Sequence, residues 1–234
     1  MNSPTRTKIC GITRPEDAAA ATEAGADYLG AIIKFPPSPR SLEATEARRV
    51  FANCPTLVVA VTVNLDNDAL RSIVDTIGPG VVQLHGDEDI RQIADLRGCV
   101  SCEIWKTLHI RVDTSISEQE AVSLLQTAKG FAAAGVDKIL LDAKMGTGSD
   151  ARLGGTGRTV DWSLAARLVA SSPCPAILGG GLNPINIGDA MRQVRPFAVD
   201  VSSGVESAPG RKDHAKIIEF IQTVRGRASS EESP

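Results

Sequence analysis

Three polar side chains in this sequence lie beside short apolar runs, where they could take part in proton transfer. Cys10 ends the first of these runs, Asp142 directly follows a later one, and Asp200 lies inside the last. A thiol and a carboxylic acid form a usable acid–base pair, because one can accept a proton while the other donates one. If Cys10 and Asp142 face each other across a bound ligand, they can move protons at two different atoms of it.

Two glycine- and serine-rich segments follow the last two apolar runs and could bind a phosphate. Their backbone N–H groups are not screened by large side chains, and such groups surround phosphates at loops and helix N-termini. The loops after the seventh and eighth strands of a (β/α)₈ barrel commonly do this. The expected phosphate-binding residues are Gly179, Gly180, Gly181, Ser202, Ser203 and Gly204.

Short β-rich runs alternate with longer helical patterns along almost the whole chain, which is typical of parallel βαβ units. Strands are predicted at Lys8–Cys10, Tyr28–Ile33, Leu57–Val63, Val81–Leu84, Glu103–Leu108, Lys138–Leu141, Ala176–Leu178 and Ala198–Val201. Helices are predicted at Pro15–Ala24, Thr45–Ala52, Asp68–Thr76, Glu88–Leu96, Glu118–Ala134, Ser163–Ser171, Ile185–Val194 and Asp213–Val224. With 234 residues, the chain fits one α/β domain, a (β/α)₈ TIM barrel.

Several local signals support this barrel. The tetrapeptides Ala24–Asp27 and Ala134–Asp137 both end a helix and precede a strand, the second and the sixth, as two similar half-barrels would give. Asp161 and Asn183 are expected to begin helices. The polar residues 1–6 and 226–234 are predicted to be flexible ends.

The barrel would bring the polar residues together at one end. Side chains at the C-terminal ends of the strands face the substrate in this fold, and alternate residues of a strand face the same side. The first and eighth strands are neighbours at barrel closure, about 4.8 Å apart. Lys8, Cys10 and Asp200 are therefore predicted to form one polar cluster, with Asp142 on the far side of the barrel mouth.

The composition and the net charge of the chain limit the kinds of partner that the protein is expected to bind. The net charge of −3, with no block of Lys or Arg, gives no reason to expect nucleic acid or an anionic membrane surface. We find no signal peptide and no stretch near the roughly 20 apolar residues of a membrane span. The expected partner is a small sugar phosphate, bound by a monomer or homodimer.

The five cysteines are an odd number and are scattered, which argues against a disulfide framework and favours reduced thiols in the cytoplasm. Cys99 and Cys102 have CxxC spacing. A closed zinc site needs a second such pair or a pair of histidines close by in the sequence. We interpret the two as incidental thiols and expect no metal.

Six motifs in this order closely resemble the phosphoribosylanthranilate isomerase family. The resemblance extends from about Lys8 to Val224. The motifs are Lys8–Thr13 (KICGIT), Pro37–Arg40 (PSPR), Gln83–Gly86 (QLHG), Gly154–Gly157 (GGTG), Gly179–Pro184 (GGGLNP) and Arg195–Glu206, which ends in DVSSGVE.

The resemblance implies an Amadori rearrangement in tryptophan biosynthesis, an aldose–ketose isomerisation without cofactor or metal. N-(5-phosphoribosyl)anthranilate becomes 1-(2-carboxyphenylamino)-1-deoxyribulose 5-phosphate. By the same resemblance Cys10 is the general base and Asp142 the general acid, and Arg40 meets the anthranilate carboxylate. The other residues expected to bind substrate are Lys8, His85 and Asp200. The loop with Gly154–Gly157 is expected to close over the barrel mouth.

These roles set demands on two pKa values. Cys10 must be ionised, although a free thiol titrates near ~8.5, and Asp142 must stay protonated, although a free carboxyl titrates near ~3.9. Lys8 on the same face is expected to favour the thiolate, partly offset by Asp200. Burial and the substrate phosphate are expected to keep Asp142 neutral. We therefore expect kcat/KM to fall on the acid side with a group well below ~8.5.

The sequence departs from the family in its pocket walls and in one loop. Gly30–Lys34 and Thr62 stand where many relatives carry aromatic residues. Met145–Leu153, within the long segment 143–157, resembles an insertion.

Three other functions fit the sequence less well. A metal-dependent epimerase needs several His and Asp ligands, whereas the only histidines are His85, His109 and His214. A relative of indole-glycerol-phosphate synthase would want Lys and Glu at strand ends, and these match poorly. A non-catalytic sensor of phosphate ligands would not need both Cys10 and Asp142.

Overall fold

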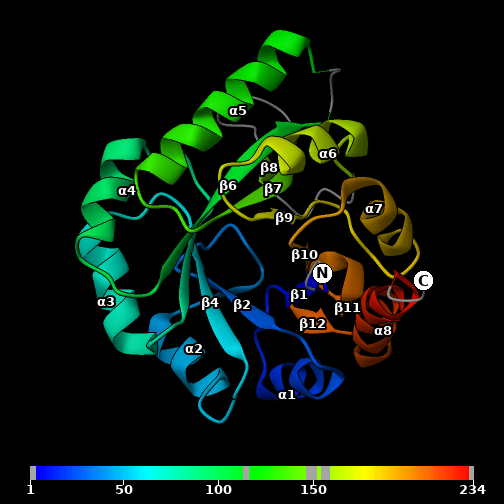
Figure 1. Cartoon of the computed structure of the whole chain (residues 1–234). Coiled ribbons are helices and arrows are strands. Elements are labelled where there is room, and N and C mark those ends of the chain that lie inside the picture. Colours follow the sequence, from blue (N-terminus) through cyan, green and yellow to red (C-terminus); the bar gives the residue numbers. More distant parts are fainter. Residues whose placement is uncertain (1–3, 113–115, 146–151, 154–158, 232–234) are drawn as a thin grey trace.

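The computed structural model describes residues 4–112, 116–145, 152–153 and 159–231. Eight parallel strands of this part of the chain pair side by side, and the pairing of the first two strands closes them into a barrel (Figure 1). In spatial order they are β1 (Arg6–Ile9), β2 (Tyr28–Ile33), β4 (Leu57–Thr62), β5 (Val81–Leu84), β6 (Glu103–Arg111), β7 (Lys138–Met145), β9 (Ala176–Leu178) and β10 (Ala198–Val201). The predicted single-domain (β/α)₈ barrel is confirmed.

Four short strands lie outside the barrel path in the described residues. β3 (Ser41–Leu42) extends the sheet beside β2, and β8 (Arg152–Leu153) pairs antiparallel with the end of β7. β11 (Glu206–Ala208) and β12 (Arg211–Lys212) form an antiparallel pair after β10. The expected lid motif Gly154–Gly157 lies outside the described residues, as does most of the expected insertion.

The helices follow one another around the outside of the barrel in chain order (Figure 1). They are α1 (Pro15–Ala24), α2 (Ala44–Val50), α3 (Asn67–Ile77), α4 (Ile90–Arg97), α5 (Glu118–Ala133), α6 (Trp162–Ser171), α7 (Ile187–Val194) and α8 (His214–Glu231). Because α8 continues to Glu231, residues 226–231 are helical; the flexibility expected of 1–6 and 226–234 stays a prediction.

One of the two expected helix starts is right and the other is a turn too early. The Asp161 carboxylate accepts the backbone N–H groups of Ser163 and Leu164 and begins α6 as expected. The Asn183 side chain accepts N–H groups from Ile185 and Asn186 at 2.9 and 3.2 Å. These bonds order a separate turn, and α7 begins only at Ile187.

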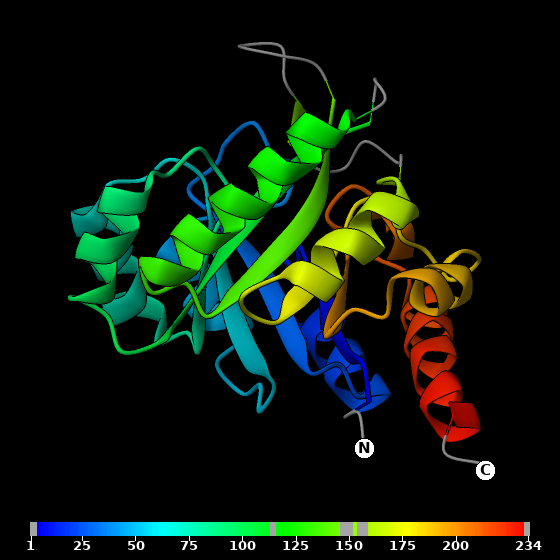
Figure 2. The same cartoon turned by 45° about the horizontal axis from the view of Figure 1, so that its top comes forward.

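β6 and β7 are longer than predicted, and this changes where two polar residues lie. They pair over seven positions, including His109 with Asp142, so both residues lie inside strands and not after them. Figure 2 shows these green strands reaching beyond the shorter blue ones. The strand continues past the predicted end at Leu141, because Asp142, Ala143 and Lys144 also pair with β6.

One buried cluster fills the inside of the barrel. It takes side chains from every barrel strand or the residue following it: Cys10, Tyr28, Val59, Val61, Val81, Trp105, Leu140, Ile177 and Ala198. Tyr28 and Trp105 meet edge to face with ring centroids 4.9 Å apart. Because alternate residues face the same side, this cluster identifies which other positions point inward.

Candidate active site

Lys8 and Cys10 project inward beside Asp200 at the junction of β1 and β10. Lys8 and Asp200 are paired in register, and the Lys8 Nζ donates to the Asp200 carboxylate at 2.9 Å. The neighbouring β2 makes room with Gly30, where a Cβ would stand 2.8 Å from the Cys10 Sγ and 3.1 Å from the Lys8 Nζ. The structure therefore brings Lys8, Cys10 and Asp200 together.

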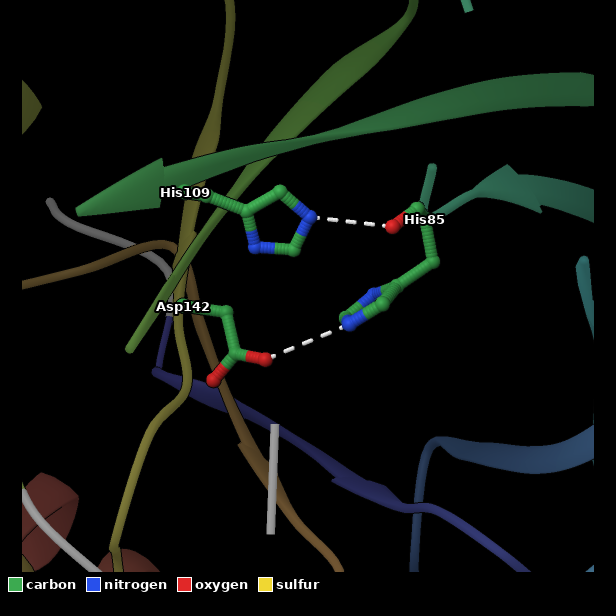
Figure 3. A group of neighbouring side chains, drawn as sticks. All are labelled: His85, His109 and Asp142. Atoms are coloured by element: carbon green, nitrogen blue, oxygen red, sulfur yellow. Dashed lines mark hydrogen bonds and ion pairs between the residues drawn. The ribbon is translucent and has the colours of Figure 1, made fainter. Parts of the chain in front are cut away.

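Asp142 projects inward from β7, since it shares the parity of the buried Leu140. The His85 Nε2 lies 3.3 Å from the Asp142 Oδ2, and the Ala143 N–H donates to Oδ1 at 2.9 Å. The His109 Nε2 bonds the backbone oxygen of His85 at 2.9 Å. Figure 3 shows the three side chains turned toward one another.

His85 is fixed by two further side chains. Its Nδ1 lies 2.9 Å from the Thr107 Oγ1 and 3.1 Å from the Gln83 Nε2. Sequence reasoning assigned no role to Gln83, Thr107 or His109. The sequence did contain a signal for them, since Gln83 lies two residues before His85 and Thr107 lies two residues before His109. Residues two apart on a strand face the same side, so these side chains could have been expected to face the barrel mouth.

The two glycine-rich loops lie against each other beside Asp142. Gly180 and Gly181 have φ of 81° and 64°, and a Cβ on Gly180 would stand 3.3 Å from the Asp142 Oδ1. A Cβ on Gly204 would collide with the Leu182 carbonyl oxygen. The Gly179 N–H is already bonded to the Leu141 oxygen at 2.8 Å, which takes this donor away from the expected phosphate contacts.

Arg40 approaches Gly11 close to the Ser202 side chain and forms an ion pair with Glu206. Its Nε and Nη2 donate to the two carboxylate oxygens of Glu206 at 2.7 and 2.5 Å. The Lys212 Nζ bonds the same carboxylate at 2.9 Å and the Ser202 oxygen at 3.1 Å. Burial raises the pKa of Glu206, but Arg40 and Lys212 lower it by more. Glu206 stood in the DVSSGVE motif without a role; no sequence signal indicated Lys212.

The comparisons with known proteins agree with this geometry. A family model described as N-(5'phosphoribosyl)anthranilate (PRA) isomerase matches residues 7–223. The N-(5'-phosphoribosyl)anthranilate isomerase of Methanopyrus kandleri is 41% identical over 221 residues, covering 94% of this chain and 98% of the relative. The chain belongs to the N-(5'-phosphoribosyl)anthranilate isomerase family.

Solved structures of the N-(5'-phosphoribosyl)anthranilate isomerase family share the fold. Monomers of a dimeric phosphoribosylanthranilate isomerase from Thermotoga maritima are 35% identical, with a TM-score of 0.78 and coverage of 95% of this chain and 99% of theirs. Another phosphoribosylanthranilate isomerase, 33% identical with a TM-score of 0.77 and the same coverage, is solved with reduced 1-(o-carboxyphenylamino)-1-deoxyribulose 5-phosphate. The chain is thus an isomerase of tryptophan biosynthesis, which decides against the epimerase, synthase and sensor alternatives.

The protonation of the two expected catalytic groups differs from the sequence-based expectation. Burial raises the pKa of the Cys10 thiol, and the nearby Lys8 ammonium lowers it by less, so the expectation of a depressed thiol pKa is wrong for the free protein. Burial lowers the pKa of Lys8, but Asp200 and Cys10 raise it by more and keep the lysine charged.

Asp142 is shifted in the opposite direction from the one expected. Burial raises its pKa, but the hydrogen bond from His85, the charge on the two imidazoles when protonated and the Ala143 N–H together lower it by more. The expectation of a neutral carboxyl is therefore also wrong for the free protein. Burial and the nearby His85 lower the pKa of His109 to about 4, so that imidazole is neutral at physiological pH.

Proposed function

We propose that this chain catalyses the isomerisation of N-(5'-phosphoribosyl)anthranilate to 1-(2-carboxyphenylamino)-1-deoxyribulose 5-phosphate, with Cys10 as general base and Asp142 as general acid. The observation that carries the proposal is their placement. Both side chains project into the barrel mouth, one beside the Lys8 ammonium and the other against His85. A base and an acid on different strands can act on different atoms of one ligand.

The proposed reaction moves two protons: Asp142 donates one to the substrate and Cys10 accepts one from it. Asp142 donates a proton to the ring oxygen of the ribose, and the C1′–O bond breaks as the nitrogen lone pair forms an iminium. Cys10 as thiolate then removes the C2′ proton, giving an enolamine. The enolamine tautomerises to the ketone as its hydroxyl proton is lost and C1′ gains a proton. Transfer of the proton held by Cys10 back to Asp142 through solvent restores both the thiolate and the acid.

This chemistry needs the proton on Asp142 and not on Cys10, the reverse of the free protein. The substrate itself supplies part of the change. A phosphate at Gly180 and Gly181 would bring negative charge close to the Asp142 carboxylate, because a Cβ on Gly180 would already stand 3.3 Å from Oδ1. A like charge raises the pKa of a carboxyl. Substrate binding thereby increases the fraction of protein with a protonated Asp142.

The remaining substrate groups fit the other residues of the site. Gly180, Gly181, Ser202, Ser203 and Gly204 hold the phosphate in this proposal. Arg40 meets the anthranilate carboxylate through Nη1, since its Nε and Nη2 bond Glu206. The bidentate bond to Glu206 fixes the plane of the guanidinium, so the N–H groups of Nη1 point in a defined direction. Lys8, Asp200 and His85 hold the acid and base in position next to the substrate.

A cytoplasmic location and the absence of nucleic-acid and membrane partners belong to the same proposal. All five cysteines are free thiols, as a reducing compartment would keep them. Among the described residues, no helix is both long and apolar enough to cross a bilayer. The chain is proposed to be a monomer or a homodimer, and the sedimentation of the purified chain measures which of the two forms.

The proposal is tested by replacing Cys10 with alanine. We expect kcat, followed by the loss of substrate fluorescence, to fall about 10²–10⁴-fold, the usual contribution of a general base. Binding of the reduced product analogue should change little, because the phosphate loops are untouched. Cys54→Ala is the matched control, since that thiol lies outside the barrel mouth, packed near Thr22 and Thr56. Turnover of Cys10→Ala within a few-fold of the native chain would refute the assignment.

A further inference from the structure

His109 holds an unused electron pair inside the barrel mouth. Its Nε2 bonds the backbone oxygen of His85 at 2.9 Å, and a carbonyl oxygen can only accept, so the ring proton lies on Nε2. The other nitrogen, Nδ1, is then a bare acceptor. It is buried and has no hydrogen-bond partner among the described residues. Figure 3 places this nitrogen on the side of the ring that faces Asp142.

Two further atoms that can bind a metal ion lie close to His109, one on His85 and one on Asp142. One nitrogen from each histidine and one carboxylate oxygen of Asp142 lie within 4.8 Å of one another. The His85 Nε2 and the Asp142 Oδ2 are 3.3 Å apart. Two ligands on a tetrahedral zinc ion, with bonds of about 2.0–2.1 Å, stand about 3.3–3.4 Å apart. This pair already has the spacing of two ligands of one ion, and the His109 nitrogen lies within 4.8 Å of both atoms.

We propose that His85, His109 and Asp142 form a binding site for a divalent transition-metal ion such as Zn²⁺ or Co²⁺. Such ions bind well to a set of two imidazoles and one carboxylate, whereas Mg²⁺ and Ca²⁺ prefer ligand sets made of oxygen atoms alone. The three protein ligands leave a fourth position open to water or to a substrate oxygen.

The surrounding hydrogen bonds orient both histidines for this task. A metal-bound histidine usually donates its other N–H to a carbonyl, carboxylate or hydroxyl, and the bond of His109 to the His85 oxygen is of this kind. For His85 to bind through Nε2, its proton must lie on Nδ1, where the Thr107 Oγ1 at 2.9 Å can accept it. The buried Gln83 Oε1 has no partner among the described residues and becomes a second acceptor if the amide turns over.

An ion in this site would block the isomerase. The ion takes the Asp142 oxygen that has to donate a proton, and this part of the inference rests on the proposed function. The binding itself does not depend on it. We therefore expect zinc to inhibit turnover in competition with the substrate and to be removed by a chelator.

The test uses Co²⁺ as a spectroscopic probe on the full-length chain freed of metal with a chelator. We expect visible absorption bands of a four- or five-coordinate ion with nitrogen and oxygen ligands, lost on adding Zn²⁺. In His109→Gln the amide nitrogen can keep the bond to the His85 oxygen while the Nδ1 ligand is gone. We expect this variant to bind Co²⁺ about 100-fold more weakly, and whatever turnover it keeps to need a correspondingly higher zinc concentration for half inhibition. His214→Gln, which changes a histidine paired with Asp17 outside the cluster, should bind as the native chain does.

Three results would overturn the proposal: no Co²⁺ bands, unchanged affinity in His109→Gln, or an intense sulfur-to-metal charge-transfer band that assigns the ion to Cys10 or to the Cys99–Cys102 pair. Should His109→Gln fold poorly, native chain alkylated at its thiols gives the same answer, because the proposed ligands contain no sulfur. A chain that binds Co²⁺ as expected but has no isomerase activity would refute the proposed function and leave the metal site standing.

Discussion

At the scale of single residues, the state of Cys10 depends on two opposed effects. Burial in the barrel mouth penalises a thiolate, whereas the Lys8 ammonium beside it favours one. Asp200, which accepts a hydrogen bond from the Lys8 Nζ at 2.9 Å, opposes this effect because its negative charge raises the pKa of the thiol. Burial prevails, so the pKa of the Cys10 thiol lies above its ordinary value in the free protein, and the proposed mechanism has to use the minority of molecules in which Cys10 is a thiolate.

This balance predicts the pH dependence of thiol alkylation. Because the pKa of Cys10 lies above the ordinary value near ~8.5, its thiolate fraction and its rate of reaction with iodoacetamide should keep rising above that pH. Site-resolved mass spectrometry, with a short cysteine peptide as reference, gives the midpoint. Asp200→Asn should move the midpoint down, since Asp200 raises the pKa of the thiol. A native midpoint below that of the peptide would contradict the assigned balance.

At the scale of elements, the two similar tetrapeptides have the same physical task. Gly25 and Gly135 adopt φ of 94° and 100° where a helix ends, and an aspartate follows two residues later. Asp27 accepts the Thr7 N–H at 2.8 Å, and Asp137 accepts the Ile104 N–H at 2.8 Å. Each carboxylate thus ties the start of one barrel strand to the strand that follows in the chain, β1 to β2 and β6 to β7.

Removing either carboxylate should weaken the barrel. Asp27→Ala leaves the buried Thr7 N–H without its acceptor, and Asp137→Ala does the same at Ile104, at about 1–3 kcal/mol of unfolding free energy each. Urea unfolding measures the loss. Asp75→Ala, an exposed position late in α3, is the control and should change stability by less than about 0.5 kcal/mol. Equal unfolding free energies of all three variants would show that Asp27 and Asp137 do not stabilise the barrel.

At the scale of the whole molecule, the two ends of the chain close the barrel together. β1 pairs with β10, and α1 packs against α8. Asp17 of α1 is fully buried and accepts bonds from the His214 Nε2 at 2.8 Å and the Lys212 N–H at 3.2 Å. Lys212 in turn bonds Glu206, which holds Arg40. Closure of the fold and the position of the expected carboxylate-binding arginine therefore share one network.

Asp17→Ala tests this coupling. We expect a loss of about 1–3 kcal/mol in unfolding free energy by urea titration, because the Lys212 N–H would be buried without an acceptor. The same variant should raise KM more than it lowers kcat, since the disturbance reaches Arg40 and not the acid or base. Glu16→Ala, the adjacent exposed carboxylate paired with Arg14, serves as control and should leave both quantities nearly unchanged. An effect on kcat alone would argue against the route through Lys212.

The sequence by itself determined the order of the elements, the barrel and the residues that face its mouth. Hydrophobic periodicity and chain order carry that information, since alternate residues of a strand face one side and neighbouring strands of a barrel follow in sequence. Four of the eight barrel strands have the predicted bounds, and Lys8 meets Asp200 as the parity required.

Only the tertiary structure decided which contacts the site residues make and whether Cys10 and Asp142 carry a proton. The lengths of β6 and β7, the bidentate hold of Glu206 on Arg40 and the contact of His85 with Asp142 all depend on residues far apart in the chain. The protonation of Cys10 and Asp142 is decided in the same way. A pKa responds to burial and to every charge within a few ångströms, and no pattern along one chain reports those distances.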